Sequence, residues 1–259
     1  MVASIAMEDF RARKERGDII TALTAYDYPT ARLLDESGVD IILVGDSLGM
    51  VVLGYEDTTE VTLEAMLHHT RAAARGVKRA LLVADMPIHT YDTPAAAVET
   101  AHALVAAGAQ AVKLEGGVSH VAQIEAVVAA GIPLMGHIGM LPQNVRKEGG
   151  YKLKGRTQGE AELLLRDGRA VQEAGAFSVV LEIVAAETSR QITEALEIPT
   201  IGIGSGESCD GQILVTHDLI GLFPWFVPKF VRREADIAGE IRKAVAAFIE
   251  RTHAPGHLS

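Results

Sequence analysis

Four acidic side chains stand where short apolar segments of this chain end. These side chains are Asp46, Asp85, Glu115 and Glu182. A carboxylate at the end of a buried strand is costly unless something pairs with it. Clustered carboxylates also repel one another unless a cation or a shared proton relieves them. The pattern therefore indicates a common site for a cation or a proton transfer, as in an enzyme.

The candidate ligands indicate which kind of cation would bind. They are carboxylate oxygens, with no His or Cys close by in the sequence, and such ligands suit a hard ion. Magnesium takes one or two carboxylates and leaves positions for water and substrate oxygens. We predict that Asp46 and Asp85 bind Mg²⁺, and that Glu115 binds it directly or through water.

Three further side chains belong to the same predicted site. Glu182 follows an apolar strand, so burial should raise the pKa of its carboxyl and suit it to act as a general base. Lys113 lies two residues before Glu115 and points to the same face of a strand. It either binds an anionic oxygen of the substrate or forms a structural ion pair. For His137, a satisfied polar contact and a catalytic role both fit.

The string Gly45–Gly49 matches the Gly-x-Ser-x-Gly pattern of serine hydrolases and contains the Gly-Asp-Ser-Leu string of some esterases. A nucleophile elbow needs an acid and a histidine downstream. Esterases of the second kind carry Asp-x-x-His, and none of the nine histidines has an aspartate three residues before it. We therefore interpret Ser47 as a hydrogen-bond donor to the substrate.

Composition narrows the class of protein. The chain has 259 residues and a single cysteine, so it can form no internal disulfide. Its net charge is −10, and no predicted element carries the basic stripe that nucleic-acid binding needs. The first ten residues lack the pattern of a signal peptide, and no apolar run approaches the ~20 residues of a membrane span. We expect a cytoplasmic protein with no nucleic-acid or membrane partner. The basic loop 146–156 is either solvated or a flap that meets an anionic substrate tail.

Strands and helices alternate along the chain, and the strands are almost wholly apolar, which indicates a parallel sheet buried on both faces. Eight such units favour an α/β fold, a (β/α)₈ TIM barrel in a single domain over residues 1–259. An open doubly wound sheet is the alternative, but the first strand lacks its Gly-rich turn. We expect a helical extension over residues 1–18, with its helix over Met7–Glu15, and a flexible tail over 253–259.

The last predicted units are the least regular. The eighth strand is expected somewhere in Leu214–Leu222, and a terminal helix from about Glu234 to Arg251. Glycines follow the predicted helices where a left-handed C-cap favours them, at Gly38, Gly76, Gly108, Gly131 and Gly175.

Several strings, taken together and in order, resemble the ketopantoate hydroxymethyltransferase family. They span most of the chain: Leu23–Asp27, Val44–Met50, Ala84–Pro87, Val112–Gly117, Gly136–Gln143 and Pro199–Gly204. The resemblance implies a magnesium-dependent barrel that assembles as a homodecamer. It further implies transfer of a hydroxymethyl group from 5,10-methylenetetrahydrofolate to 3-methyl-2-oxobutanoate through a metal-stabilised enolate, giving 2-dehydropantoate for pantothenate synthesis.

By matching motif positions, the resemblance also assigns residue roles. Metal binding falls to Asp46, Asp85 and Glu115, and the role of proton acceptor to Glu182. Contacts with the keto acid fall to four residues: Asp46, Ser47, Asp85 and Lys113.

Two rival functions remain to be weighed. A barrel of the phosphoenolpyruvate mutase or isocitrate lyase type would carry a Lys-x-Cys-Gly loop, whereas the single cysteine here, Cys209, follows Glu207 and Ser208. A non-catalytic binder of keto acid or folate would not need a base such as Glu182.

Overall fold

The computed structural model describes residues 7–254. Its backbone contacts divide the chain into two compact units, Met1–Ile213 and Leu214–Ser259. The single domain expected over residues 1–259 stays a prediction. Within the described part, no helix is long and apolar enough to span a membrane.

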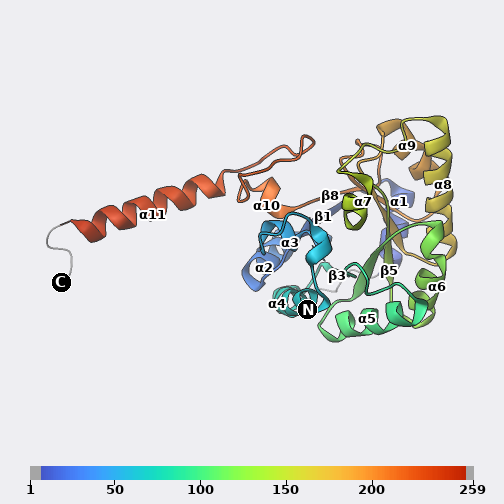
Figure 1. Cartoon of the computed structure of the whole chain (residues 1–259), viewed down its shortest axis with the longest axis horizontal. Helices are drawn as coiled ribbons and strands as arrows, with labels where there is room; N and C mark the ends of the chain where they lie inside the picture. Colours follow the sequence, from blue (N-terminus) through green and yellow to red (C-terminus); the bar gives the residue numbers. More distant parts are fainter. Residues whose placement is uncertain (1–6, 255–259) are drawn as a thin grey trace. The chain divides into compact units, whose positions relative to one another are not determined.

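Within residues 7–254, eight parallel strands close into a barrel in chain order, which confirms the predicted fold (Figure 1). The strands are β1 Ile20–Thr24, β2 Ile41–Val44, β3 Leu81–Asp85, β4 Ala111–Glu115, β5 Leu134–Gly139, β6 Ser178–Glu182, β7 Thr200–Ile203 and β8 Gly211–Leu214. The register places Asp85 beside Lys113 and Glu115 beside His137. Residues near the carboxyl ends of neighbouring strands therefore meet at one mouth.

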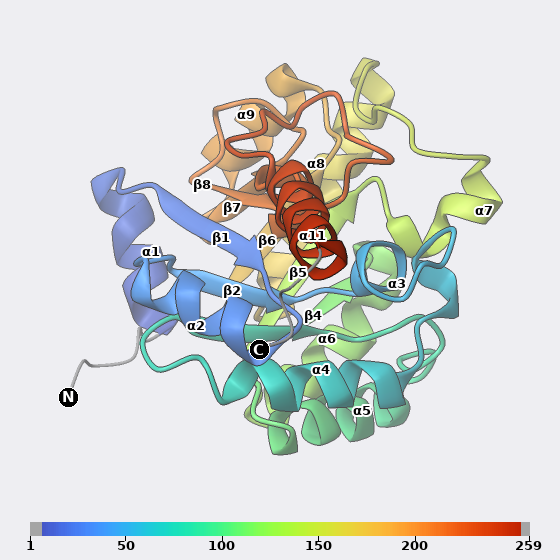
Figure 2. The ribbon, with the colours of Figure 1, turned by 90° about the vertical axis from the view of Figure 1, so that its left-hand side faces the viewer.

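Helices cover the outside of the barrel, and α4, α5, α6, α8 and α9 follow one another around it (Figures 1 and 2). The α-helices of the first unit are α1 Met7–Arg16, α2 Tyr28–Glu36, α3 Leu48–Val51, α4 Leu63–Ala74, α5 Pro94–Ala106, α6 Val121–Ala129, α7 Val145–Glu148, α8 Gln158–Glu173 and α9 Ala186–Ala195. Short 3₁₀ turns are η1 Thr58–Glu60, η2 Val118–His120 and η3 Pro142–Asn144. Threonine side chains cap the starts of three long helices by accepting backbone N–H bonds, at Thr62, Thr93 and Thr157.

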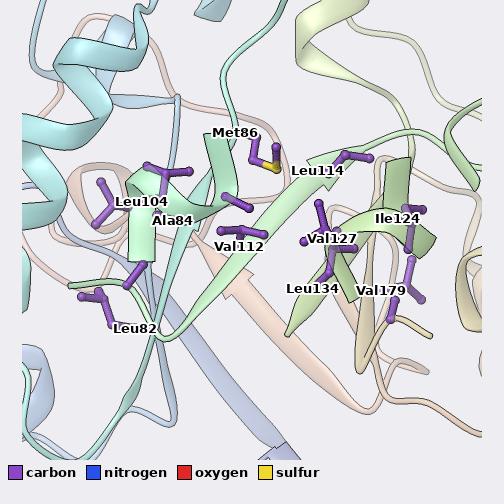
Figure 3. Packing of buried hydrophobic residues seen from close by; sticks show 14 of the residues in the cluster. Leu82, Ala84, Met86, Leu104, Val112, Leu114, Ile124, Val127, Leu134 and Val179 are labelled. Carbon is purple, nitrogen blue, oxygen red and sulfur yellow. The ribbon is translucent and has the colours of Figure 1, made fainter. Parts of the chain in front are cut away.

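One apolar core lies between the strands and these helices. In Figure 3, strand residues such as Leu82, Val112 and Leu134 lie close to helix residues such as Leu104 and Ile124. Alternate residues of the same strands point outward into this core, because side chains on a strand alternate between its faces. Burial on both faces explains why the strands read as continuous apolar runs.

The remaining strand residues point into the barrel, and the lower part of this interior is a second apolar cluster. Its strand residues are Ile20, Ala22, Ile41, Leu43, Leu81, Val83, Ala111, Met135, Val180, Ile201 and Ile213. The predicted N-terminal helix is confirmed as α1, and its Phe10 is fully buried in this cluster, with its ring 6.0 Å from that of Phe177. Helix α1 thus supplies apolar packing to the lower barrel.

Four of the five glycine caps are confirmed, because Gly38, Gly108, Gly131 and Gly175 have positive φ. The prediction for Gly76 is wrong, since its φ is not positive. A Cβ atom at Gly76 would lie 2.7 Å from the carbonyl oxygen of Tyr28 and 2.8 Å from the backbone nitrogen of Arg32. Gly76 therefore serves close packing against α2 rather than a left-handed turn.

The position of the eighth strand differs from the prediction. The eighth strand was placed in Leu214–Leu222, but β8 is Gly211–Leu214, and the described chain passes from β7 to β8 through residues 204–210 without a helix. A four-residue strand with half its side chains outside the core gives little apolar signal. The predicted position of the eighth strand was therefore wrong, although the eight-stranded barrel is confirmed within the described residues.

The second unit contains α10 Thr216–Leu219 and α11 Ile237–His253. The terminal helix begins later than the expected Glu234, because the side chain of Asp236 caps it by accepting the N–H of Gly239. The predicted tail over 253–259 lies mostly outside the described residues, as do the first six residues of the predicted extension over 1–18.

Candidate active site

The four predicted acids meet at the mouth of the barrel. Asp85, Glu115 and Glu182 are the last residues of β3, β4 and β6, and Asp46 lies two residues beyond β2. The backbone N–H of Asp46 donates to Asp85 Oδ2 at 3.1 Å, which joins the ends of two neighbouring strands. The structure therefore brings together the residues that the sequence singled out.

Lys113 lies inside this group, as its alternation with Glu115 predicted. Its Nζ is 2.5 Å from Asp85 Oδ1 and 3.2 Å from Nδ1 of His137. Burial alone would lower the pKa of Lys113, but the carboxylates of Asp85 and Glu115 outweigh burial and raise it. The side chain therefore stays an ammonium, and of its two predicted roles the ion pair is present.

His137 was left open between packing and chemistry, and it proves to be central to the site. Its Nε2 lies 3.2 Å from Glu182 Oε2, and its Nδ1 lies 3.6 Å from Glu115 Oε1. Burial, together with the charge of Lys113, holds its pKa well below the ordinary range, so the ring is neutral. Because the ammonium of Lys113 can only donate, Nδ1 is the acceptor and the ring proton is on Nε2. Nε2 lies near Glu182 but forms no hydrogen bond.

Burial makes the acids of the site reluctant to ionise. It raises the pKa of Asp46 to about 7, helped by the charge of Asp85. Burial likewise raises the pKa of Glu182 to about 7, although Lys113 opposes the shift. The pKa of Glu115 is raised well above its usual range by burial and by Asp46. A cation in this group would relieve the charge repulsion.

The backbone around Glu182 is tightly constrained. Its carbonyl accepts the N–H of Met140 at 2.8 Å, and Gly139 allows the close approach, since a Cβ there would lie 2.4 Å from that carbonyl oxygen. The next residue, Ile183, has φ of 47°, a left-handed conformation that costs a β-branched side chain about 1–3 kcal/mol. Backbone strain of this kind is common at functional sites, and here it lies next to Glu182.

Sequence reasoning did not identify two residues that the site depends on. Gln143 donates its backbone N–H to Glu115 Oε2 and its side-chain amide to Asp46 Oδ2, at 3.1 and 2.9 Å. Tyr91 in turn donates its hydroxyl to the side-chain carbonyl of Gln143. Both lie in loops where no periodicity marks a buried position, and Gln143 was named only as part of a family string.

Ser47 lies beside these acids at the start of α3. Its Oγ is 2.8 Å from the hydroxyl of Tyr26, and its side chain makes no cap bond to the helix. The proposed bond from Ser47 to a substrate stays a prediction.

The basic loop beyond β5 carries its own counter-charges. Arg146 pairs with Asp57 at 2.6 Å and with Glu60 at 2.8 Å. Lys154 pairs with Glu148. The two pairs of Arg146 join the loop to the segment after β2, and the pair of Lys154 and Glu148 lies within the loop. A contact of this loop with an anionic substrate tail stays a prediction.

The donor set fits a divalent cation. In the described part, the cluster brings four carboxyl groups close to a single ammonium, and Glu115 Oε1 is buried without a hydrogen-bond donor. Among residues 7–254, no three His, Cys, Asp or Glu side chains are placed to surround one ion by themselves. That arrangement suits magnesium, which takes one or two carboxylates and completes its shell with water and substrate oxygens.

Solved structures with this arrangement of strands define the class. The chain aligns with a phosphoenolpyruvate phosphomutase from Streptomyces platensis subsp. rosaceus at a TM-score of 0.68 and 15% identity, over 98% of this chain and 92% of the other. It aligns with a 2,3-dimethylmalate lyase at a TM-score of 0.66 and 20% identity, over 99% and 92%. At such identities the likeness shows the fold alone, a (β/α)₈ barrel.

Sequence relatives are more specific. The family model for ketopantoate hydroxymethyltransferase matches residues 4–255. A 3-methyl-2-oxobutanoate hydroxymethyltransferase of Acetivibrio thermocellus is 53% identical over 93% of this chain and 86% of its own length. One from Ignicoccus hospitalis is 51% identical over 95% and 94%. The chain belongs to the ketopantoate hydroxymethyltransferase family, and it is a hydroxymethyltransferase.

Proposed function

We propose that this enzyme transfers a hydroxymethyl group from 5,10-methylenetetrahydrofolate to 3-methyl-2-oxobutanoate and forms 2-dehydropantoate for pantothenate synthesis. Relatives that are about half identical carry the name 3-methyl-2-oxobutanoate hydroxymethyltransferase. The net reaction consumes one water, which supplies the new hydroxyl group, and releases tetrahydrofolate. The bond that breaks first is the C–H bond at C3 of the keto acid.

The observation that carries the proposal is the position of Glu182. Its carboxyl ends a barrel strand, is mostly buried, and has a pKa that burial raises to about 7. A general base works best when its pKa lies near the working pH, because it is then both ionised and basic. Glu182 would take the proton from C3, and the electron pair left there would attack the methylene carbon of the folate, breaking one of its two C–N bonds. The second C–N bond would break as water supplies the hydroxyl group and tetrahydrofolate leaves.

Other groups of the site would hold the keto acid as charge develops on it. The ammonium of Lys113 would stabilise negative charge on the enolate oxygen, since fixed charges that face a developing anion lower the barrier. Ser47 would donate a hydrogen bond to the same substrate. Asp46 and Asp85 would bind Mg²⁺, with Glu115 completing the site directly or through water. When bound, the ion would polarise the 2-oxo group and acidify C3.

Solvent exchange tests the base without the folate. The enzyme is incubated in D₂O with Mg²⁺ and 3-methyl-2-oxobutanoate, and the loss of the C3 proton signal is followed by NMR. Glu182→Gln should slow this exchange by about 10²–10⁴-fold, the usual worth of a positioned general base. Mg²⁺ binding should survive, because a neutral amide of the same shape replaces the carboxyl.

The matched control is Glu207→Gln, which changes an exposed acid in the segment after β7. It should exchange C3 at the wild-type rate. Exchange by Glu182→Gln at that same rate would remove Glu182 as the base. Wild-type enzyme that catalyses no exchange and forms no 2-dehydropantoate with folate present would overturn the proposed reaction itself.

A homodecamer is part of the proposal, on the family resemblance alone. Native mass spectrometry should then find an assembly of ten 27.5 kDa chains.

A further inference from the structure

Gln143 occupies an unusual position for a neutral side chain. It lies in the turn η3 beyond β5, is 4% exposed, and contacts two of the acids at the mouth. Its backbone N–H donates to Glu115 and its Nε2 to Asp46, as described above. Nε2 also donates to the carbonyl oxygen of Met86 at 3.0 Å. One residue thus joins the end of β4 to the segments that follow β2 and β3.

The hydrogen-bond chemistry fixes which way the amide points. The carbonyl oxygen of Met86 can only accept, so the amide NH₂ group must face it and Asp46. Oε1 then needs a donor, and the hydroxyl of Tyr91 supplies it. Tyr91 is itself 6% exposed, with its ring 5.6 Å from that of His120 in an edge contact. A buried amide with all these groups satisfied has one stable orientation.

We propose that Gln143, oriented by Tyr91, is a positioning residue for the acids of the active site. It binds Asp46 Oδ2 and Glu115 Oε2, which leaves the other oxygen of each carboxyl for an ion or a substrate. Glu115 Oε1, the oxygen that Gln143 does not bind, is buried without a hydrogen-bond donor. The inference rests on the proposed function for the identity of the ion and the substrate.

The two oxygens of each carboxyl therefore have different roles: one accepts a hydrogen bond from Gln143, and the other can bind the ion or the substrate. Without the amide, Asp46 would lose a donor on Oδ2 and could rotate that oxygen toward another partner. Residues that hold a metal ligand in this way are typically worth about 10–100-fold in metal affinity. The side chain of Gln143 acts through Asp46, so its loss should weaken ion binding more than it slows turnover at saturating ion.

Two variants separate the parts of this arrangement. Gln143→Met keeps the length of the side chain and removes its hydrogen bonds to Asp46, Met86 and Tyr91, while the backbone N–H can still donate to Glu115. Tyr91→Phe removes only the hydroxyl that orients the amide. Binding of Mn²⁺, a paramagnetic substitute for Mg²⁺, is measured by EPR on purified folded enzyme, and C3 exchange is measured over a range of Mg²⁺ concentrations.

We expect the Mn²⁺ Kd to rise about 10–100-fold in Gln143→Met and by a smaller factor in Tyr91→Phe. Adding Tyr91→Phe to Gln143→Met should change the Kd no further, because the hydroxyl acts only through the amide. At saturating Mg²⁺ both variants should recover most of the wild-type kcat for exchange.

Gln172→Met is the matched control. The side-chain oxygen of Gln172 accepts the N–H groups of Glu197 and Ile198, just before β7 and at the opposite end of the barrel from the acids. This variant should melt at a lower temperature and bind Mn²⁺ with the wild-type Kd. A purely structural role for Gln143 would give the same pair of results.

Asp46→Asn distinguishes the two proposals. If wild type binds Mn²⁺ and Asp46→Asn does so poorly, while Gln143→Met and Tyr91→Phe keep the wild-type Kd, the positioning role is refuted and the metal site stands. If Asp46→Asn binds Mn²⁺ as wild type does, the metal assignment fails first, and the role given to Gln143 fails with it.

Discussion

The lower and upper parts of the barrel interior are built by the same strands and have opposite chemistry. On β4, Ala111 lies in the apolar cluster, while Lys113 and Glu115 reach the mouth. On β5, Met135 is in the cluster and His137 is above it. Each step of two residues along a strand stays on the inner face, so only the residue type changes.

The two regions contribute to the enzyme in different ways. The lower part buries apolar side chains, including Phe10 from α1, and burial of such area is the main source of folding stability. The upper part buries carboxyl groups whose pKa values are raised, so ionising them in the folded chain costs free energy. The difference indicates that apolar burial in the lower barrel offsets the free-energy cost of the buried carboxyl groups in the upper part.

The largest effect is expected at the lower part. Phe10→Ala removes a fully buried ring and should reduce the free energy of unfolding by about 3–5 kcal/mol. Urea unfolding at one fixed chain concentration measures this loss. C3 exchange per folded molecule should not change, because Phe10 packs at the end of the barrel away from the acids.

Leu33→Ala serves as the control, because Leu33 is an apolar residue on α2 with 63% of its surface exposed. It should alter stability by no more than about 0.5 kcal/mol. If Phe10→Ala slowed exchange per folded molecule as strongly as it lowered stability, the two parts would be coupled and the comparison would fail.

The second-largest effect is expected in the upper part of the barrel, where a substitution at Glu182 should raise the free energy of unfolding rather than lower it. Burial raises the pKa of Glu182 from 4.5 to about 7, so between these values the folded chain holds a proton that the unfolded chain has lost. The contribution of Glu182 is therefore neutral below about pH 4.5, turns unfavourable as pH rises to about 7, and is constant above that. At pH 8 the cost is about 3 kcal/mol.

Glu182→Gln removes this cost, so the inactive variant should be the more stable enzyme. In EDTA at pH 8 its free energy of unfolding should exceed that of wild type by up to about 3 kcal/mol, and the gain should vanish near pH 4.5. Glu207→Gln, at an exposed position, should show no such trend. A gain that is equal at both pH values would come from packing and not from the buried charge.

The parts of this comparison that follow from local pattern could be predicted from the sequence. Asp85 and Glu115 close continuous apolar runs, and parallel strands bring such ends to one mouth. Lys113 followed from the two-residue repeat of a strand. These inferences need only the periodicity of a strand and the closure of a barrel.

Contacts made by loops could not be found in the same way. Gln143 and Tyr91 reach the acids because a turn after β5 and the segment after β3 fold back over the mouth. No repeat in the sequence fixes where such segments return. The partners of His137 were equally hidden, since alternation places it inside the barrel without saying which of several acids it meets.

The smallest effect sharpens the comparison by asking whether the upper part keeps its raised pKa in the working enzyme. With Glu182 as the base, kcat/KM for C3 exchange should fall about tenfold for each pH unit below about 7, since only the ionised carboxyl accepts a proton. Saturating Mg²⁺ keeps the other acids from limiting the rate, because binding of a cation favours their ionised form. A rate that stays level down to about pH 5 would mean that Glu182 has an ordinary carboxyl pKa during catalysis. The raised pKa of Glu182, and its cost in the free energy of unfolding, would then exist only in the ion-free protein. The upper part of the barrel would no longer be destabilised by this carboxyl once the ion is bound.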